Sequence, residues 1–237
     1  MSRRGELSFQ TRLRQVINRN VAAKARSRRR GVPSGKRARG AQRNDCLPYA
    51  PPEDWHEPTG SPRAYRILEQ PPGAGYRHVL TAQDIRERLE QVPPHFLKSL
   101  EVIQLSRMTR KKQTFPCYGM QWGSALYLYP LEDSLIEYFL RPPHPNLMNE
   151  ARMYGGRWEH EGPSTWKLVW TEESIRDFYL NNILIHELGH LVDDRNSGYV
   201  ERERYAEWFA IRYGYLPSRS PSESAPPRRT VRRHHAL

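Results

Sequence analysis

The sequence predicts an α+β domain, and three observations support this fold class. A short helix comes first, several short strands follow it, and two helices close the domain, which is an α+β order. Pro and Gly residues interrupt the strand region, whereas neither occurs in the runs Glu172–Leu188 and Tyr199–Tyr213 of the two closing helices. The 237 residues suit one such domain with a tail at each end.

The first predicted helix covers Ala82–Gln91 and is stopped by Pro93 and Pro94. Short apolar runs rich in β-branched and aromatic residues predict strands after it. These strand segments are Leu100–Met108, Tyr118–Tyr129 (a strand or hairpin), Leu135–Leu140 and Trp166–Trp170.

A long helix is predicted to begin at Glu172, to run without Pro or Gly to Leu188, and to end before the polar stretch that starts at Asp193. Thr171 is a suitable N-cap, and Glu172 and Glu173 place negative charge at the positive end of the helix dipole. The run is apolar on more than one side, which is typical of a buried helix.

This helix carries the motif His186-Glu187-Leu188-Gly189-His190. Residues four apart lie on one face of a helix, so both imidazoles can face one metal ion. Glu187 lies beside the first ligand, where it can take a proton from an attacking water. The competing interpretation makes both histidines ordinary hydrogen-bonded core residues and leaves Glu187 exposed; a nearby third ligand disfavours it.

A second helix, Tyr199–Tyr213, supplies candidates for that ligand, and Gly214 and Pro217 are expected to terminate it. One face of this helix carries two carboxylates and two small residues: Glu203, Ala206, Glu207 and Ala210. We expect one carboxylate to reach the metal and the other to hydrogen-bond a ligand imidazole. The alternative is a solvated face on which the carboxylates pair with neighbouring arginines.

The segments HELGHLVDD (186–194) and ERYAEWF (203–209) together resemble the catalytic core of the gluzincin metallopeptidases. The nearest branch is that of anthrax lethal factor-like and Pro-Pro endopeptidases. The resemblance covers residues 183–213. It departs from the family in the short loop between the two helices.

The resemblance implies one Zn²⁺ ion on His186, His190 and Glu203, with Glu187 as the general base. It further implies that Glu207 is a carboxylate supporting a ligand, that Asp193 is a structural or supporting acid, and that Tyr199 stabilises the oxyanion. Tyr199 lies only four residues before Glu203, closer than the corresponding Tyr of the family.

In fold and function, the resemblance implies a zincin-like metallopeptidase domain and a zinc-dependent endopeptidase acting on protein or peptide substrates. The edge strand of a small twisted sheet would then line the cleft and pair with an extended peptide, and we expect Ala125–Tyr129 to be that strand. One alternative is a catalytically silent binding protein of the same fold. Another is a peptidase recruited to nucleic acid.

Charge and composition predict four regions. Residues 1–45 form a basic disordered arm with fourteen Lys/Arg and two Asp/Glu, a net charge of +12 that equals the 38 − 26 of the whole chain. Residues 46–76 form a Pro-rich linker, within which Tyr65–Leu68 is expected to add a short segment to the domain. Residues 77–216 form the catalytic domain, and 217–237 a Pro/Ser/Arg-rich tail. The arm suits nucleic acid or another polyanion; a solubilising tail and a targeting peptide are its alternatives.

Localisation is expected to be cytoplasmic or otherwise intracellular. No apolar run is long enough for a transmembrane helix, and no hydrophobic secretory signal follows the first basic residues. Cys46 and Cys117 are isolated and predict neither a disulfide framework nor a second zinc site. His234 and His235 are assigned to the loose tail rather than to a ligand set.

Overall fold

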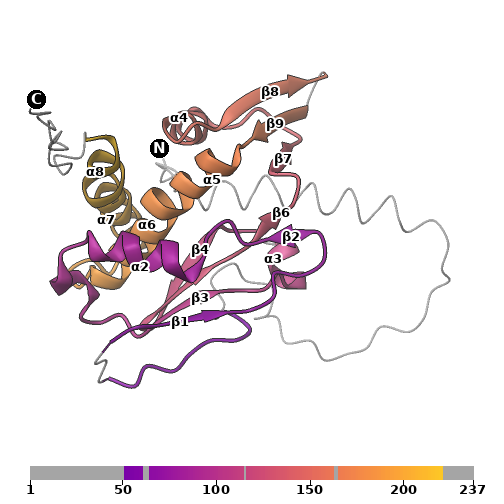
Figure 1. Cartoon of the computed structure of the whole chain (residues 1–237). Coiled ribbons are helices and arrows are strands. Elements are labelled where there is room, and N and C mark those ends of the chain that lie inside the picture. Colours follow the sequence, from indigo (N-terminus) through magenta and orange to yellow (C-terminus); the bar gives the residue numbers. More distant parts are fainter. Residues whose placement is uncertain (1–50, 61–63, 115, 163–164, 221–237) are drawn as a thin grey trace, which may run out of the picture.

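The computed structural model describes residues 51–60, 64–114, 116–162 and 165–220 (Figure 1). Within these residues the chain forms small sheets and helices, so the predicted α+β class is confirmed. The predicted basic arm, Cys46 and most of the predicted C-terminal tail lie outside them.

A four-stranded sheet lies below the helices in Figure 1, with strand order β1-β3-β5-β4. Its strands are β1 (Arg66–Glu69), β3 (Val102–Leu105), β4 (Gly119–Trp122) and β5 (Ala125–Leu128). β1, β3 and β5 are parallel, whereas β4 and β5 form an antiparallel hairpin. The strand predicted within Leu100–Met108 and the hairpin within Tyr118–Tyr129 are therefore confirmed.

The expectation that Ala125–Tyr129 forms the edge of this sheet is wrong. β5 pairs with β3 on one side and with β4 on the other, so β1 and β4 are the edges. All four residues of β5 are buried. An uninterrupted apolar strand is typical of a position covered on both faces.

Part of the segment predicted as a linker, 46–76, belongs to the domain. β1 pairs with β3, and β2 (Tyr76–Arg77) pairs with β6 (Leu131–Glu132). Successive side chains of a strand point to opposite faces. Ile103 belongs to the main core, whereas Gln104 faces the other side.

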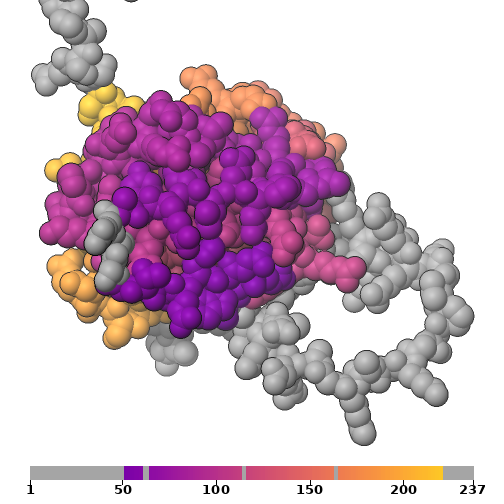
Figure 2. All heavy atoms as spheres, turned by 60° about the horizontal axis from the view of Figure 1, so that its bottom comes forward, coloured from indigo at the N-terminus to yellow at the C-terminus, as the bar shows by residue number. Residues whose placement is uncertain are grey.

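Residues 51–60, here called the strap, cross that other side of the sheet. His56 bonds to Gln104 through its ring (2.7 Å), and its backbone N–H donates to Tyr127 Oη (2.8 Å). The backbone N–H groups of Thr59 and Gly60 donate to the Glu101 carboxylate. In Figure 2 the indigo residues, which begin the described part of the chain, lie at the surface of the molecule. Hydrogen bonds to side chains of the sheet hold the strap in place. The strap does not pair as a strand, so its sequence lacks a strand pattern.

The remaining elements surround this sheet. They are α2 (Ala82–Glu90), the 3₁₀ turn η2 (Pro94–Leu97), α3 (Arg110–Thr114), α4 (Pro145–Met153) and a three-stranded antiparallel sheet of β7 (Ile136–Phe139), β9 (Thr165–Val169) and β8 (Arg157–Glu161). The helix predicted from Ala82 and the strands predicted as β7 and β9 are confirmed. β8 and α4 were not predicted, because the sequence Arg-Trp-Glu-His-Glu of β8 lacks an apolar alternation.

The long predicted helix forms in three joined parts: α5 (Glu172–Phe178), the π-helical turn η3 (Tyr179–Ile183) and α6 (Leu184–Val192). Thr171 caps its start, accepting the Ser174 backbone N–H at 3.1 Å. The helix is buried along most of its length, as its apolar character predicts.

The last helix continues past its expected terminators. α7 (Tyr199–Ala210) passes into a second π-helical turn, η4 (Ile211–Tyr215), and then α8 (Leu216–Arg219). Gly214 does not end the helix. It lies where the helix contacts the backbone of η3, and a side chain there would collide with that backbone. Pro217 lies in α8, directly after the π-helical turn, so it does not end the helix where the sequence predicted.

Candidate metal centre

The motif residues lie on α6, which packs against β4, β5 and α7 (Figure 1). His186 and Glu187 are 6% and 3% exposed, so the interpretation that left Glu187 exposed is wrong. The imidazole centroids of His186 and His190 are 4.8 Å apart, as expected for positions one helical turn apart.

Glu203 of α7 faces both histidines. His190 Nε2 lies 3.5 Å from Glu203 Oε1, and His186 Nε2 lies 3.7 Å from Glu203 Oε2. These separations exceed the roughly 2.7–3.2 Å of an N–H···O hydrogen bond. In a tetrahedral zinc centre with bonds of about 2.0–2.2 Å, two ligand atoms lie roughly 3.3–3.6 Å apart. The ligand atoms of the three side chains fall within 4.8 Å of one another, so the group could hold a metal ion.

Close packing of α6 and α7 brings Glu203 to this position. A Cβ added at Gly189 would lie 3.0 Å from Ala206 Cα and 3.1 Å from Phe209 Cβ. Arg202 donates to the carbonyls of His190 (3.0 Å) and Asp193 (3.3 Å), which are at the C-terminal end of α6. The small-residue face predicted on α7 thus packs on the motif helix. Arg202 binds the carbonyl groups at the end of that helix and does not pair with a carboxylate on a solvated face.

The protonation of the two histidines is unequal without a metal. Burial lowers the pKa of His186, but the carboxylates of Glu203, Glu187 and Glu150 outweigh burial and raise it to about 9. Burial and the charge of His186 lower the pKa of His190 to about 3. The pair therefore holds one proton near neutral pH, which a metal has to displace.

Glu187 lies against the edge strand β4. A Cβ added at Gly119 would lie 2.9 Å from Glu187 Cγ and Oε1 and 2.8 Å from Ile183 Cγ2. Gly119 is therefore the residue that lets the sheet edge approach the carboxylate. The sequence showed a glycine here but did not show which helix would pass it.

The structure also places the other predicted site residues. Glu207 is exposed, one turn beyond Glu203, so the residue grouped with the histidines is Glu203. Asp193 is buried and accepts from the Asn196 backbone N–H (3.2 Å) and side-chain amide (2.9 Å), which gives it a structural role at the end of α6. Tyr199 is the first residue of α7, and its oxyanion role remains a prediction.

One carboxylate beside the centre was not predicted. Glu150 of α4 accepts the Asn182 side-chain amide at 2.6 Å, and its charge acts on both His186 and Glu207. Burial raises the pKa of Glu150 to about 7. No sequence signal marks this residue, because α4 is remote from the motif along the chain.

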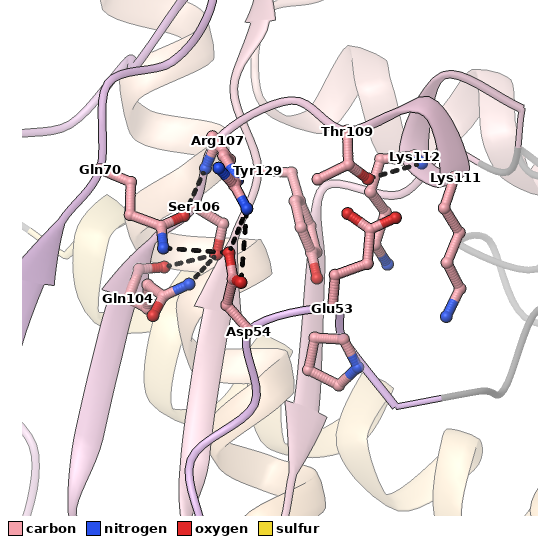
Figure 3. Close-up of a pocket in the computed structure, with 11 residues that line it drawn as sticks. Glu53, Asp54, Gln70, Gln104, Ser106, Arg107, Thr109, Lys111, Lys112 and Tyr129 are labelled. Carbon is pink, nitrogen blue, oxygen red and sulfur yellow. Dashed lines mark hydrogen bonds and ion pairs between the residues drawn. The ribbon is translucent and has the colours of Figure 1, made fainter.

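A small polar pocket lies between the strap and the sheet (Figure 3). Its cavity of about 10 Å³ has room for at most one water molecule. Asp54 of the strap pairs with Arg107 at 3.1 Å and accepts from Gln70 at 3.3 Å. The polar groups thus attach the strap to the sheet, and the pocket is too small for a substrate.

Comparison with protein-family models, curated proteins and solved structures found no match for the chain. Among the described residues, no helix is both long and apolar enough to cross a membrane.

Proposed function

We propose that this chain is a zinc-dependent endopeptidase with a zincin-like fold. The observation that carries the proposal is the convergence of His186, His190 and Glu203 beside the buried carboxylate of Glu187. Two imidazoles and one carboxylate are a common ligand set of catalytic zinc, which keeps an open position. The resemblance of the two helical segments to gluzincins supports the same conclusion.

The residues of the chain divide the chemistry between them. His186, His190 and Glu203 would hold the zinc ion, which when bound supplies a Lewis acid and lowers the pKa of a water to about 7. Glu187 accepts a proton from the attacking water and returns it to the leaving amine. β4 is an edge strand next to Glu187, so an extended peptide pairing with its free edge would place a carbonyl near that carboxylate.

Cleavage of a peptide library by the full chain tests the proposal. We expect hydrolysis that a zinc chelator abolishes and that added zinc restores. A library left intact by the zinc-loaded protein, under conditions in which the protein is folded, would favour the silent binding protein of the same fold.

Recruitment to nucleic acid is a second proposal, and the charge of the arm favours it. The +12 of residues 1–45 accounts for the whole excess charge of the chain. Lys and Arg runs of this kind bind phosphates without sequence specificity. In this version the peptidase acts on proteins bound to DNA or RNA.

A further inference from the structure

Two π-helical turns face each other at one end of the α6–α7 pair. η3 leads into α6 and η4 follows α7. A Cβ added at Gly214 would lie only 1.9 Å from the Asn181 carbonyl oxygen, so the two turns are in backbone contact. π-helical turns are rare and occur frequently at functional sites.

Arg88 of α2 bridges these two turns. Its side chain is buried, with 5% exposure of the residue. Nε donates to Asn181 Oδ1 at 2.6 Å, and a terminal nitrogen donates to the Tyr213 carbonyl. Asn181 is itself fixed, because its amide donates to Asp177 (2.7 Å) and its carbonyl accepts the Tyr154 hydroxyl (3.2 Å). One guanidinium thus joins the helix of the two histidines to the helix of Glu203.

If Arg88 served only to fill space between the helices, its burial would be unfavourable, because a buried charge loses its hydration. An apolar side chain of similar volume would commonly stabilise a buried position at least as well as a charge. A guanidinium differs in offering several N–H donors in a rigid planar fork, which fixes the relative positions of two acceptors. Here the acceptors belong to two different helices, so the fork fixes the position of one helix against the other.

The proposed ligands His186, His190 and Glu203 lie between two arginine contacts, each of which joins their two helices. At the loop end, Arg202 of α7 holds the carbonyls of His190 and Asp193. At the other end, Arg88 holds Asn181 and Tyr213. We propose that Arg88 is a positioning residue for the metal centre, which sets the separation between Glu203 and the histidines. This inference rests on the proposed metal site.

Metal binding by full-length Arg88→Lys and Arg88→Met tests it. Zinc affinity would be measured by competition with a chelating dye, and ligand geometry by the visible spectrum of the cobalt-loaded protein. We expect Arg88→Met to bind zinc about tenfold more weakly and to show an altered cobalt spectrum. Arg88→Lys cannot reach both acceptors with a fork, so we expect a smaller change in the same direction. If Arg88→Met does not fold, Arg88→Lys carries the test.

Ile85→Ala is the matched control, because Ile85 is fully buried on the same helix but donates no side-chain hydrogen bond. It should lower thermal stability and leave the cobalt spectrum unchanged. Wild-type affinity and spectrum in both Arg88 variants, or an equal change in Ile85→Ala, would overturn the positioning role while leaving the metal centre intact. Wild-type protein that binds neither zinc nor cobalt would overturn the metal centre, and the positioning role with it.

Discussion

In the proposed function, Glu187 is the residue whose substitution distinguishes catalysis from metal binding. It lies on the motif helix between the two histidines, but its carboxylate is directed at Gly119 of β4. Glu203, in contrast, faces both imidazoles. The histidines of the motif and its glutamate thus face different parts of the structure, as the proposed ligand and base roles require.

Glu187→Gln should therefore bind zinc like the wild type and lose hydrolysis. Glutamine keeps the shape of the side chain but cannot accept a proton from the attacking water. Loss of one acid–base group typically costs about 10²–10⁴-fold in rate. Cleavage of a peptide found in the library screen, with zinc content measured on the same sample, checks this. A variant that cleaves as fast as the parent would contradict the assigned mechanism.

Glu137 gives a prediction about pH and stability that is independent of the metal. Burial raises its pKa to about 7, although Trp170 and Tyr118 donate hydrogen bonds to it (2.9 and 2.7 Å). The folded state therefore binds more protons than the unfolded state between about pH 4.5 and pH 7. By linkage, the contribution of Glu137 to the free energy of unfolding falls as pH rises through this window, by on the order of 3 kcal/mol, and is level above it.

Glu137→Gln should reduce this fall, since glutamine can still accept both hydrogen bonds and does not titrate. Glu150, whose pKa is also raised to about 7, retains its own contribution in the variant. Urea unfolding at several pH values between 5 and 8 measures the difference. An identical pH dependence in wild type and variant would show that Glu137 does not titrate in this window.

At the scale of elements, the centre depends on two places where a glycine allows close approach. Gly189 lets α7 reach the motif helix, and Gly119 lets β4 reach Glu187. In the proposed site, the first approach positions the ligand Glu203 and the second positions the base Glu187. Substitutions at the two glycines should therefore affect different steps.

Gly119→Ala should impair turnover more than zinc binding. The new methyl group would lie within 3 Å of Ile183 and Glu187, so strand or carboxylate must shift. Overpacking of this kind costs about 1–3 kcal/mol of stability. Parallel measurements of cleavage rate, zinc affinity and urea unfolding test the prediction. Unchanged turnover in a stable variant would mean that the approach of β4 does not position Glu187.

The sequence predicted those elements whose signals are local. The cap at Thr171, the apolar helix after it and the i, i+4 histidines are all within one segment, and Ala206 showed the packing face of α7. Gly214 was misread because a glycine at a helix end and a glycine at a helix contact look alike. Arg88 and Glu150 could not be found, because the partners of Arg88 are 93 and 125 residues away and that of Glu150 is 32 away.

At the scale of the whole molecule, charge and chemistry are separated along the chain. The excess positive charge belongs to residues 1–45, and the remaining residues are net neutral. The described structure begins with the strap at residue 51, which crosses the sheet on the side away from the main core. Binding through the arm and catalysis at the centre can thus be tested separately.

Deletion of residues 1–45, or replacement of Arg26, Arg28, Arg29 and Arg30 by Gln, should weaken binding to duplex DNA and leave peptide cleavage unchanged. If the arm contacts six or more phosphates, the full chain should lose about 10³-fold or more in affinity between 50 and 200 mM salt. Fluorescence anisotropy with labelled DNA measures both effects. Salt-independent binding, or none, would remove the nucleic-acid proposal.

The zinc content of the purified chain tests the central claim most directly. Elemental analysis should find one zinc ion per chain in the wild type and in Glu187→Gln, and little or none in His190→Ala. Each of the three proteins must be shown to be folded by circular dichroism. A wild type without bound zinc after incubation with the metal, or an undiminished content in His190→Ala, would contradict the metal centre.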